Sequence, residues 1–230
     1  EFGPRDIQET LNDAVRLAVL DQLDAGVDVI TDGEMHRQDF NLGFYDHLRG
    51  LRPLSAQRKQ GPEGHDQRGR WDVLEPVTAP NGLGIVGEFA YLERLGDYHL
   101  KATCPGPFTL AGRLVTGGVY ADRLAATEAL IPIVNAECKA LVEAGATFIQ
   151  LDEPSYAVYP DRPRLFVDLF NRTIDGVQAK IGIHMCFGNF RGRPVGKRSY
   201  RPLFPHIFDL HVHQFVLEFA NREMAEIDLW

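Results

Sequence analysis

The sequence has few cysteines, no excess of basic residues and no long hydrophobic run. The three cysteines, Cys104, Cys138 and Cys186, are widely spaced and odd in number, which is typical of reduced thiols rather than a disulfide framework. The formal net charge of −8 argues against binding to nucleic acid. No apolar run approaches the roughly 20 residues that cross a bilayer, and the start lacks a signal-peptide pattern. These absences predict a soluble, cytoplasmic protein that binds small molecules, with no nucleic acid or membrane partner.

Helical and strand patterns alternate along a chain whose 230 residues fit one domain, 1–230. Helical periodicity covers residues 6–25, 120–144 with an interruption at Pro132, 162–177 and, more briefly, 203–210. Short apolar runs at 27–31, 99–107, 147–151, 180–185 and 213–219 are typical of strands in a parallel sheet. This alternation predicts a parallel α/β fold. The segment 49–75 lacks periodicity and is expected to be a mobile loop insertion.

Polar residues follow the predicted strands one after another. No G-x-G-x-x-G joins a predicted strand to a predicted helix, and there is no Walker loop, so nothing favours a nucleotide-binding, doubly wound sheet. In a β/α barrel the carboxyl ends of the strands converge on one face, where active sites are built. The pattern therefore predicts a TIM-type (β/α)8 barrel. The residues that we expect at this face are Asp32, Glu34, Asp152, Glu153, His184, Cys186, Glu218 and Asn221.

His184 and Cys186 are candidate metal ligands. Residues two apart on a strand point to the same side and lie about 6.6 Å apart, so an imidazole and a thiolate can reach one zinc ion. Glu218, at the end of the next apolar run, is a third candidate. Without further evidence, the H-x-C pattern fits a buried core histidine beside an inert cysteine better than a metal site.

Five stretches, in order, resemble the catalytic domain of cobalamin-independent methionine synthase and its short single-domain relatives. These stretches are VDVITDGEMHRQDF, TCPGPFTL, FIQLDEPSY, IHMCFGNF and FVLEFANREMAEI. The resemblance implies that His184, Cys186 and Glu218 bind Zn²⁺. It also implies that Glu34 and Asp152 bind the amino group of the acceptor. Against the family pattern, the first strand, the last βα units and a further cysteine ligand are missing. We therefore expect an incomplete barrel and a remaining ligand beyond Trp230.

The activity that the resemblance implies is a zinc-dependent methyltransferase, which transfers a methyl group to the thiol of homocysteine in methionine synthesis. A bound zinc ion would supply the thiolate nucleophile. The donor is 5-methyltetrahydrofolate or its polyglutamate form, a methylated corrinoid or another alkyl compound. A corrinoid protein and a second copy of the chain remain open as partners.

Several alternatives stay open at this point. One is an epoxide:thiol transferase or a corrinoid-linked methyltransferase with the same zinc chemistry. A metal-free barrel related to uroporphyrinogen decarboxylase gives the H-x-C no role, and a metal-storage domain would use it without catalysis. Locally, Glu34 could simply pair with Arg37, and Asp152 could cap a helix or accept a hydrogen bond from the backbone.

Overall fold

The computed structural model describes residues 3–37, 39–40, 42–55, 69–190, 193–220 and 223–230. Asn221, one of the residues expected at the strand ends, lies outside these ranges. The helices are α1 (Pro4–Asp24), α2 (Ile85–Glu93), α3 (Pro107–Ala111), α4 (Arg123–Glu143), α5 (Pro154–Val158) and α6 (Pro163–Thr173), with 3-10 turns at Gly43–Asp46, Arg201–Leu203, His206–Asp209 and Ile227–Leu229. The strands are β1 (Val29–Ile30), β2 (Arg49–Leu54), β3 (Arg70–Thr78), β4 (His99–Leu100), β5 (Ala102–Pro105), β6 (Leu114–Val115), β7 (Phe148–Asp152), β8 (Lys180–Met185), β9 (Asn189–Phe190), β10 (Arg193–Pro194) and β11 (Gln214–Leu217).

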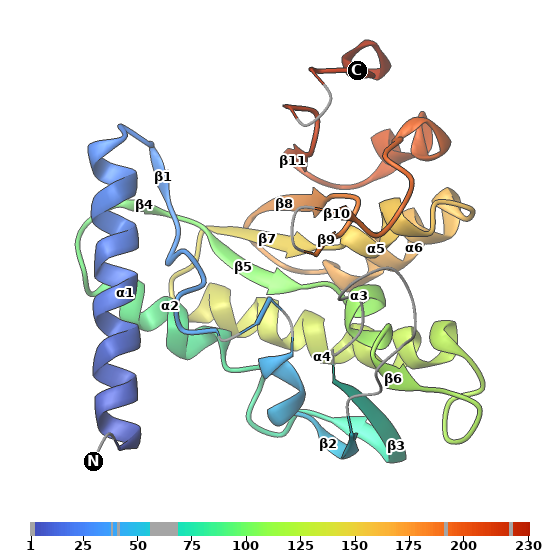
Figure 1. The fold of residues 1–230 in the computed structure, drawn as a ribbon, viewed down its shortest axis with the longest axis horizontal. Helices are drawn as coiled ribbons and strands as arrows, with labels where there is room; N and C mark the ends of the chain where they lie inside the picture. The colour runs from blue at the N-terminus through green and yellow to red at the C-terminus, as the bar shows by residue number, and fades with distance from the viewer. Residues whose placement is uncertain (1–2, 38, 41, 56–68, 191–192, 221–222) are drawn as a thin grey trace.

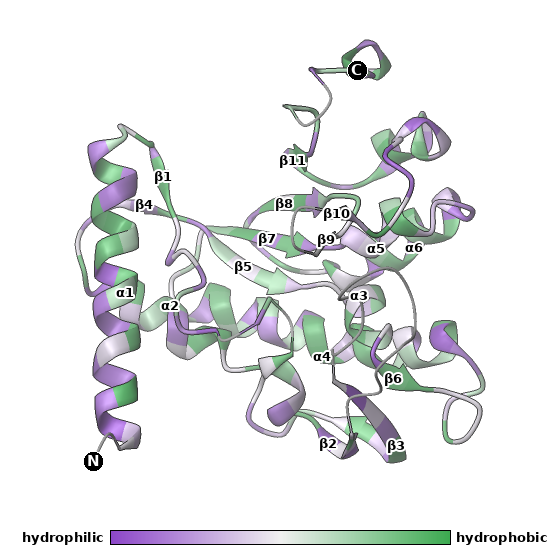
Figure 2. Cartoon of the chain, in the orientation of Figure 1, coloured by the Kyte–Doolittle hydropathy of each residue, from purple (hydrophilic) through white to green (hydrophobic). Residues whose placement is uncertain are grey.

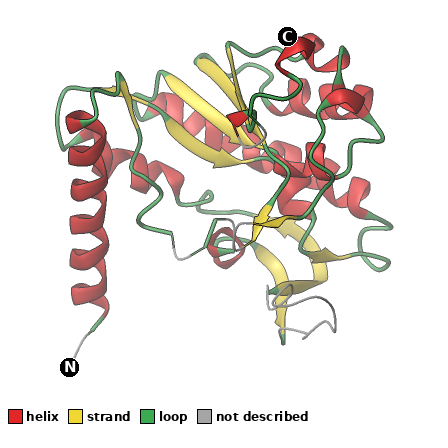
Figure 3. Ribbon diagram, turned by 45° about the horizontal axis from the view of Figure 1, so that its top comes forward, coloured by secondary structure: helices red, strands yellow, loops and turns green. Residues whose placement is uncertain are grey.

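The central sheet is parallel, and its strands follow chain order. Its hydrogen-bonded order is β5, β7, β8, β11, and β1 pairs in parallel with β4, which precedes β5 by one residue. Helix α4 runs beneath β5 and β7 in Figure 1, and the strands lie side by side in Figure 3. A doubly wound sheet reverses its strand order at a switch point, whereas a barrel does not. The described residues therefore form a parallel α/β sheet with barrel-type strand order, although they do not close a barrel.

Most of the predicted elements are confirmed, with two exceptions. The expected interruption at Pro132 was wrong, since α4 continues through it. Pro132 lies on the exposed side of the helix, where water can hydrate the carbonyl that the missing N–H leaves without a partner. The absence of structure expected across 49–75 was also wrong at both ends, because β2 and β3 pair as antiparallel strands. Residues 56–68 lie outside the described residues, so mobility there stays a prediction.

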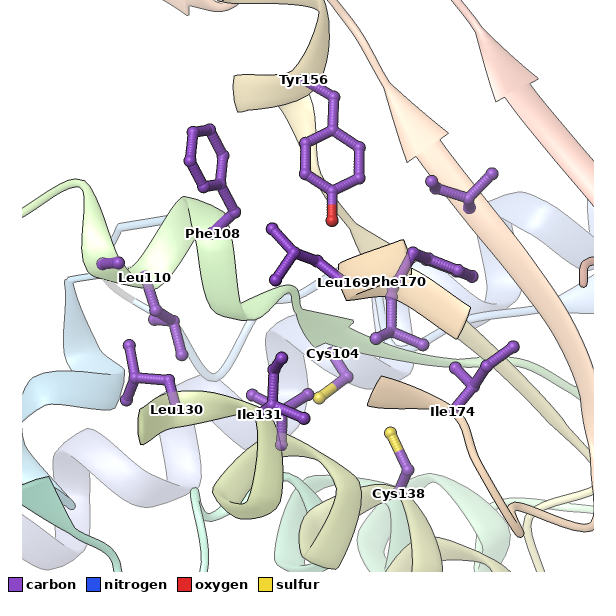
Figure 4. Packing of buried hydrophobic residues seen from close by; sticks show 14 of the residues in the cluster. Cys104, Phe108, Leu110, Leu130, Ile131, Cys138, Tyr156, Leu169, Phe170 and Ile174 are labelled. Atoms are coloured by element: carbon purple, nitrogen blue, oxygen red, sulfur yellow. The ribbon is translucent and has the colours of Figure 1, made fainter. Parts of the chain in front are cut away.

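The hydrophobic core lies between the parallel sheet and the helices that cover one side of it. Cys104 on β5 and Cys138 on α4 are both fully buried there, and Figure 4 shows their sulfur atoms among aliphatic and aromatic side chains. From β7 and β8, Ile149, Leu151 and Ile183 enter the same core at 0% exposure. We call this side of the sheet the helix face and the opposite side the inner face.

Helix α1 stands at one edge of the molecule, beside β1 and β4 (Figure 1). In Figure 2 it carries alternating polar and apolar bands, and only Val15 and Val19 are buried. The side chain of Gln22 accepts the N–H of Thr31 and donates to its carbonyl, at 2.9 Å each. Helix α1 thereby fixes the end of β1, where the first polar strand-end residues follow.

Candidate functional site

The polar residues of β7 and β8 lie on the inner face, because strand side chains alternate. Ile149 and Leu151 belong to the helix face, which leaves Gln150 and Asp152 for the inner face. The parallel register places Asp152 beside His184, and His184 beside Val216 on β11. Two of the predicted site residues therefore meet at the carboxyl ends of neighbouring strands.

Asp152 orients the imidazole ring of His184. The distance from His184 Nδ1 to Asp152 Oδ1 is 2.9 Å, and the Asp152 side chain is 3% exposed. Burial alone would lower the pKa of His184, but hydrogen bonds to Asp152 and Cys186 raise it to about 10. With Nδ1 donating to the carboxylate, Nε2 is the ring nitrogen left for a metal ion. A carboxylate partner of this kind is usual for histidines that bind zinc.

Glu218 lies at the next strand end but does not complete a metal cluster. Its Oε2 accepts the backbone N–H of Phe187 at 3.2 Å, one residue after Cys186. The hydroxyl of Tyr200 donates to the carbonyl of Met185 and accepts the N–H of Glu218. These contacts fasten the ends of β8 and β11 together. Within the ranges that the structure describes, no three His, Cys, Asp or Glu side chains are arranged to hold a metal ion.

Glu34 is held in a tight turn after β1. Its amide N–H donates to Asp32 Oδ1 at 2.9 Å, and Gly33 and Glu34 have φ angles of 67° and 58°. A Cβ atom at residue 33 would lie 2.9 Å from that of Ala18, so glycine is required there. A left-handed backbone at a non-glycine residue such as Glu34 costs about 1–3 kcal/mol and is often found at functional sites.

The carboxylate of Glu34 interacts electrostatically with that of Asp152. Glu34 Oε1 accepts from the hydroxyl of Thr103 at 2.9 Å and pairs with Arg37 at 3.1 Å. Burial raises the pKa of Glu34, Arg37 lowers it, and the charge of Asp152 raises it again. Arg37 itself is held by Glu88, at 2.7 Å. The pairing of Glu34 with Arg37, which the sequence left open, therefore coexists with an electrostatic interaction with Asp152.

Glu153 has a different place from its neighbour Asp152. It is fully buried, and its carboxylate accepts the N–H groups of Phe108 and Thr109 at 2.9 Å each and the hydroxyl of Thr109 at 2.7 Å. Burial raises its pKa to about 7, although these bonds lower it. A Cβ atom at residue 106 would lie 2.2 Å from the Glu153 side chain. Glu153 thus joins the start of α3 to the end of β7 inside the protein.

Sequence reasoning missed three polar residues around these groups. Gln150 donates to Asp152, Lys101 donates to Gln150, and Tyr200 bridges β8 and β11. Alternation could have placed Gln150 on the same face as Asp152. Lys101 lies within the predicted strand 99–107, but nothing in the sequence indicates that its side chain contacts Gln150, and Tyr200 lies outside every predicted strand.

The fold and the strand-end residues together define a class: a parallel α/β protein of barrel type with a buried polar site at the carboxyl ends of its strands. Residues 1–229 match the family described as "Cobalamin-independent synthase, Catalytic domain". The chain belongs to this family.

Curated relatives in this family are longer than the chain. The chain is 32% identical to a methionine synthase of Pyrococcus abyssi, and the match covers 97% of this chain and 62% of that protein. It is 30% identical to a methionine synthase of Sulfurisphaera tokodaii, and this match covers 100% of the chain and 64% of that protein. It thus spans less than two thirds of these relatives. A B12-independent methionine synthase of Shewanella sp. W3-18-1, solved in complex with selenomethionine, superposes with a TM-score of 0.76 at 26% identity, over 93% of this chain and 64% of that one.

Proposed function

We propose that this chain carries the thiol-acceptor site of a zinc-dependent methyltransferase, which transfers a methyl group to homocysteine in methionine synthesis. One observation carries the proposal. Asp152 holds His184 beside Cys186 at the carboxyl ends of adjacent strands, in a chain of the cobalamin-independent synthase family. A histidine whose Nδ1 is held by a carboxylate thus lies two residues from a thiol on the same strand end.

The acceptor's ammonium group would bind between Glu34 and Asp152. Partial burial raises the pKa of Glu34, and the charge of Asp152 raises it further, so a cation between the two carboxylates would relieve part of this cost. Among the described residues, both hydrogen bonds of the Asp152 side chain use Oδ1, which leaves Oδ2 for the ligand. The related Shewanella structure contains selenomethionine, an amino acid that carries both an ammonium and a methylated chalcogen.

His184, Cys186 and Glu218 would hold the zinc ion. Their nitrogen, sulfur and oxygen donors suit this metal, and the Asp152 contact fits the usual environment of a zinc-bound histidine. Glu218 would have to exchange its contact with the Phe187 N–H for the metal. When bound, zinc would lower the pKa of the acceptor thiol and supply a thiolate at neutral pH. The chain's own part is to bind the ammonium, orient the sulfur and exclude water.

The methyl donor in this proposal is 5-methyltetrahydrofolate or its polyglutamate form. The family's description as cobalamin-independent does not support the corrinoid protein that the sequence left open, nor a corrinoid-linked reaction. An epoxide:thiol transferase that uses a sulfonate-bearing thiol is disfavoured, because Glu34 and Asp152 would repel that anion.

The compartment that we propose for this reaction is the cytoplasm, since a free thiol acceptor requires reducing conditions. Among the described residues, no helix is both long and apolar enough to cross a bilayer. Association with a second copy of the chain stays a prediction.

Replacing the thiol ligand tests the proposal directly. Cys186→Ser changes volume little but removes a soft thiolate ligand, so zinc content and methyl transfer to homocysteine should both collapse while Tm stays within a few degrees. Metal analysis, a thiol-methylation assay and thermal unfolding on the full-length protein measure the three quantities.

The matched control is Cys138→Ala, in α4. Cys138 is fully buried on the helix face, so its replacement should cost stability but leave zinc stoichiometry unchanged. A Cys186→Ser protein that keeps one equivalent of zinc and normal turnover would refute the proposed function.

A further inference from the structure

A line of hydrogen bonds runs across the inner face beneath the proposed site. Lys101 Nζ lies 2.8 Å from Gln150 Oε1, and Gln150 Nε2 lies 2.9 Å from Asp152 Oδ1. The same Oδ1 atom is 2.9 Å from His184 Nδ1. Lys101 also contacts Gln214 Oε1 at 3.2 Å. Lys101 comes from the break between β4 and β5, whereas Gln214 begins β11 on the far side of β7 and β8.

The chemistry of these groups fixes the direction of every bond. An ammonium group can only donate, so the amide oxygen of Gln150 must face Lys101. The amide nitrogen of Gln150 then faces Asp152, whose carboxylate can only accept. His184 must therefore donate through Nδ1. The orientation of the histidine ring is thus linked, through three successive bonds, to the charge on Lys101.

The site has little freedom to arrange itself otherwise. Gln150 is 8% exposed and Asp152 is 2% exposed, so a missing bond would not be replaced readily by water. Gly182 stands between Gln150 and Gln214 in the strand register. A Cβ atom there would lie 3.6 Å from Gln150 Cβ and from Gln214 Oε1, so a larger side chain would enter the space in which Lys101 meets the two amides.

We infer that Lys101 and Gln150 are positioning residues for the acceptor and metal site. Lys101 orients the Gln150 amide, Gln150 engages Oδ1 of Asp152, and Asp152 directs the His184 ring while presenting Oδ2 to the acceptor's ammonium. This inference rests on the proposed function for its ligands, but the hydrogen-bonded line itself does not. It also explains why a carboxylate can serve the histidine and the substrate at once: each uses a different oxygen atom.

Substitutions along the line test the inference in the full-length protein. Gln150→Met keeps the volume and removes both bonds. Gln150→Glu keeps an acceptor for Lys101 but offers no donor to Asp152. Both should weaken zinc binding about tenfold, as losses around metal ligands commonly do, and should raise the KM for homocysteine more than they lower kcat. Lys101→Met should act in the same direction but more weakly, because the amide of Gln150 is then free to rotate.

Gln214→Met is the matched control, since Gln214 contacts Lys101 but makes no hydrogen bond to Gln150 or Asp152. It should change zinc affinity and KM less than twofold. Zinc affinity is measured by competition with a chromophoric chelator, and Tm confirms folding. The His184 Nδ1–H is followed as a downfield proton resonance in ¹⁵N-histidine-labelled protein, with and without zinc. The Gln150 variants should shift or lose this resonance, and Gln214→Met should not.

Unchanged zinc affinity and an unchanged Nδ1–H resonance in Gln150→Met would overturn the inference. If that variant does not fold, the same two measurements on Lys101→Met decide. Failure of the proposed function looks different: the unsubstituted protein would then bind no zinc and methylate no thiol. The resonance of the metal-free protein and its response to Gln150→Met would still report on the hydrogen-bonded line.

Discussion

The two faces of the central sheet use the same strands in opposite ways. On the helix face, Ile149, Leu151 and Ile183 are fully buried among apolar neighbours. On the inner face, one position away along the chain, Gln150, Asp152 and His184 bond to each other. Hydrophobic burial on one face holds the strands in register, and that register brings the polar groups together on the other. Stability and chemistry should therefore respond separately to substitutions on the two faces.

Asp152→Asn should give the largest effect on the inner face. The asparagine Oδ1 can still accept from Gln150 and His184, so the change removes the charge but retains the geometry. Loss of a charged partner for a buried ammonium costs about 2–5 kcal/mol, and homocysteine affinity should fall by that amount at saturating zinc. Isothermal titration with acceptor and with donor separates the two ligands. Equal losses of affinity for both would contradict the role assigned to Asp152.

Ile183→Ala makes the reciprocal change on the helix face of β8. A fully buried isoleucine replaced by alanine should lower the free energy of unfolding by about 2–5 kcal/mol. Zinc stoichiometry and homocysteine affinity of the folded fraction should be unchanged. Urea unfolding and ligand titration below the transition measure these quantities. If zinc binding fell in proportion to stability, the two faces would not be separable.

Glu153→Gln tests the adjacent carboxylate, and its effect should be confined to a pH window. Burial raises the pKa of Glu153 from 4.5 to about 7. The folded protein therefore holds this proton more tightly than the unfolded chain. Protonated Glu153 therefore adds up to about 3 kcal/mol to the free energy of unfolding. This contribution is complete below pH 4.5 and is lost as the pH rises to 7.

Glutamine does not titrate, so the variant should lack this decline. Unfolding free energies of both proteins between pH 4 and 8 provide the measurement, and their difference removes the contribution of all other groups. Parallel curves for the two proteins would show that Glu153 does not carry the expected pKa.

The strands and the strand-end chemistry were predictable because they depend on local pattern. Apolar runs marked β7 and β8, and alternation placed His184 and Cys186 on one side of a strand. The pairing of Asp152 with His184 depends on which strands are neighbours, which the sequence does not specify by itself. Lys101 was harder still, because its role arises from a long side chain that reaches across the sheet. The sequence did not predict that α4 continues through Pro132. A helix tolerates this proline because the residue is exposed to solvent, and the local sequence does not show that exposure.

The side chain of Glu153 fills the space that a side chain at residue 106 would need. The two residues stand 47 positions apart, yet no Cβ atom fits at residue 106 while the Glu153 carboxylate is in place. Variation at the two positions must therefore be coupled: a chain that gains a side chain at 106 has to accept a smaller residue at 153, and with it a looser attachment of α3. Gly106, which has no side chain, is thus tightly constrained in sequence. The constraint comes from Glu153, which has no chemical role in the proposed reaction.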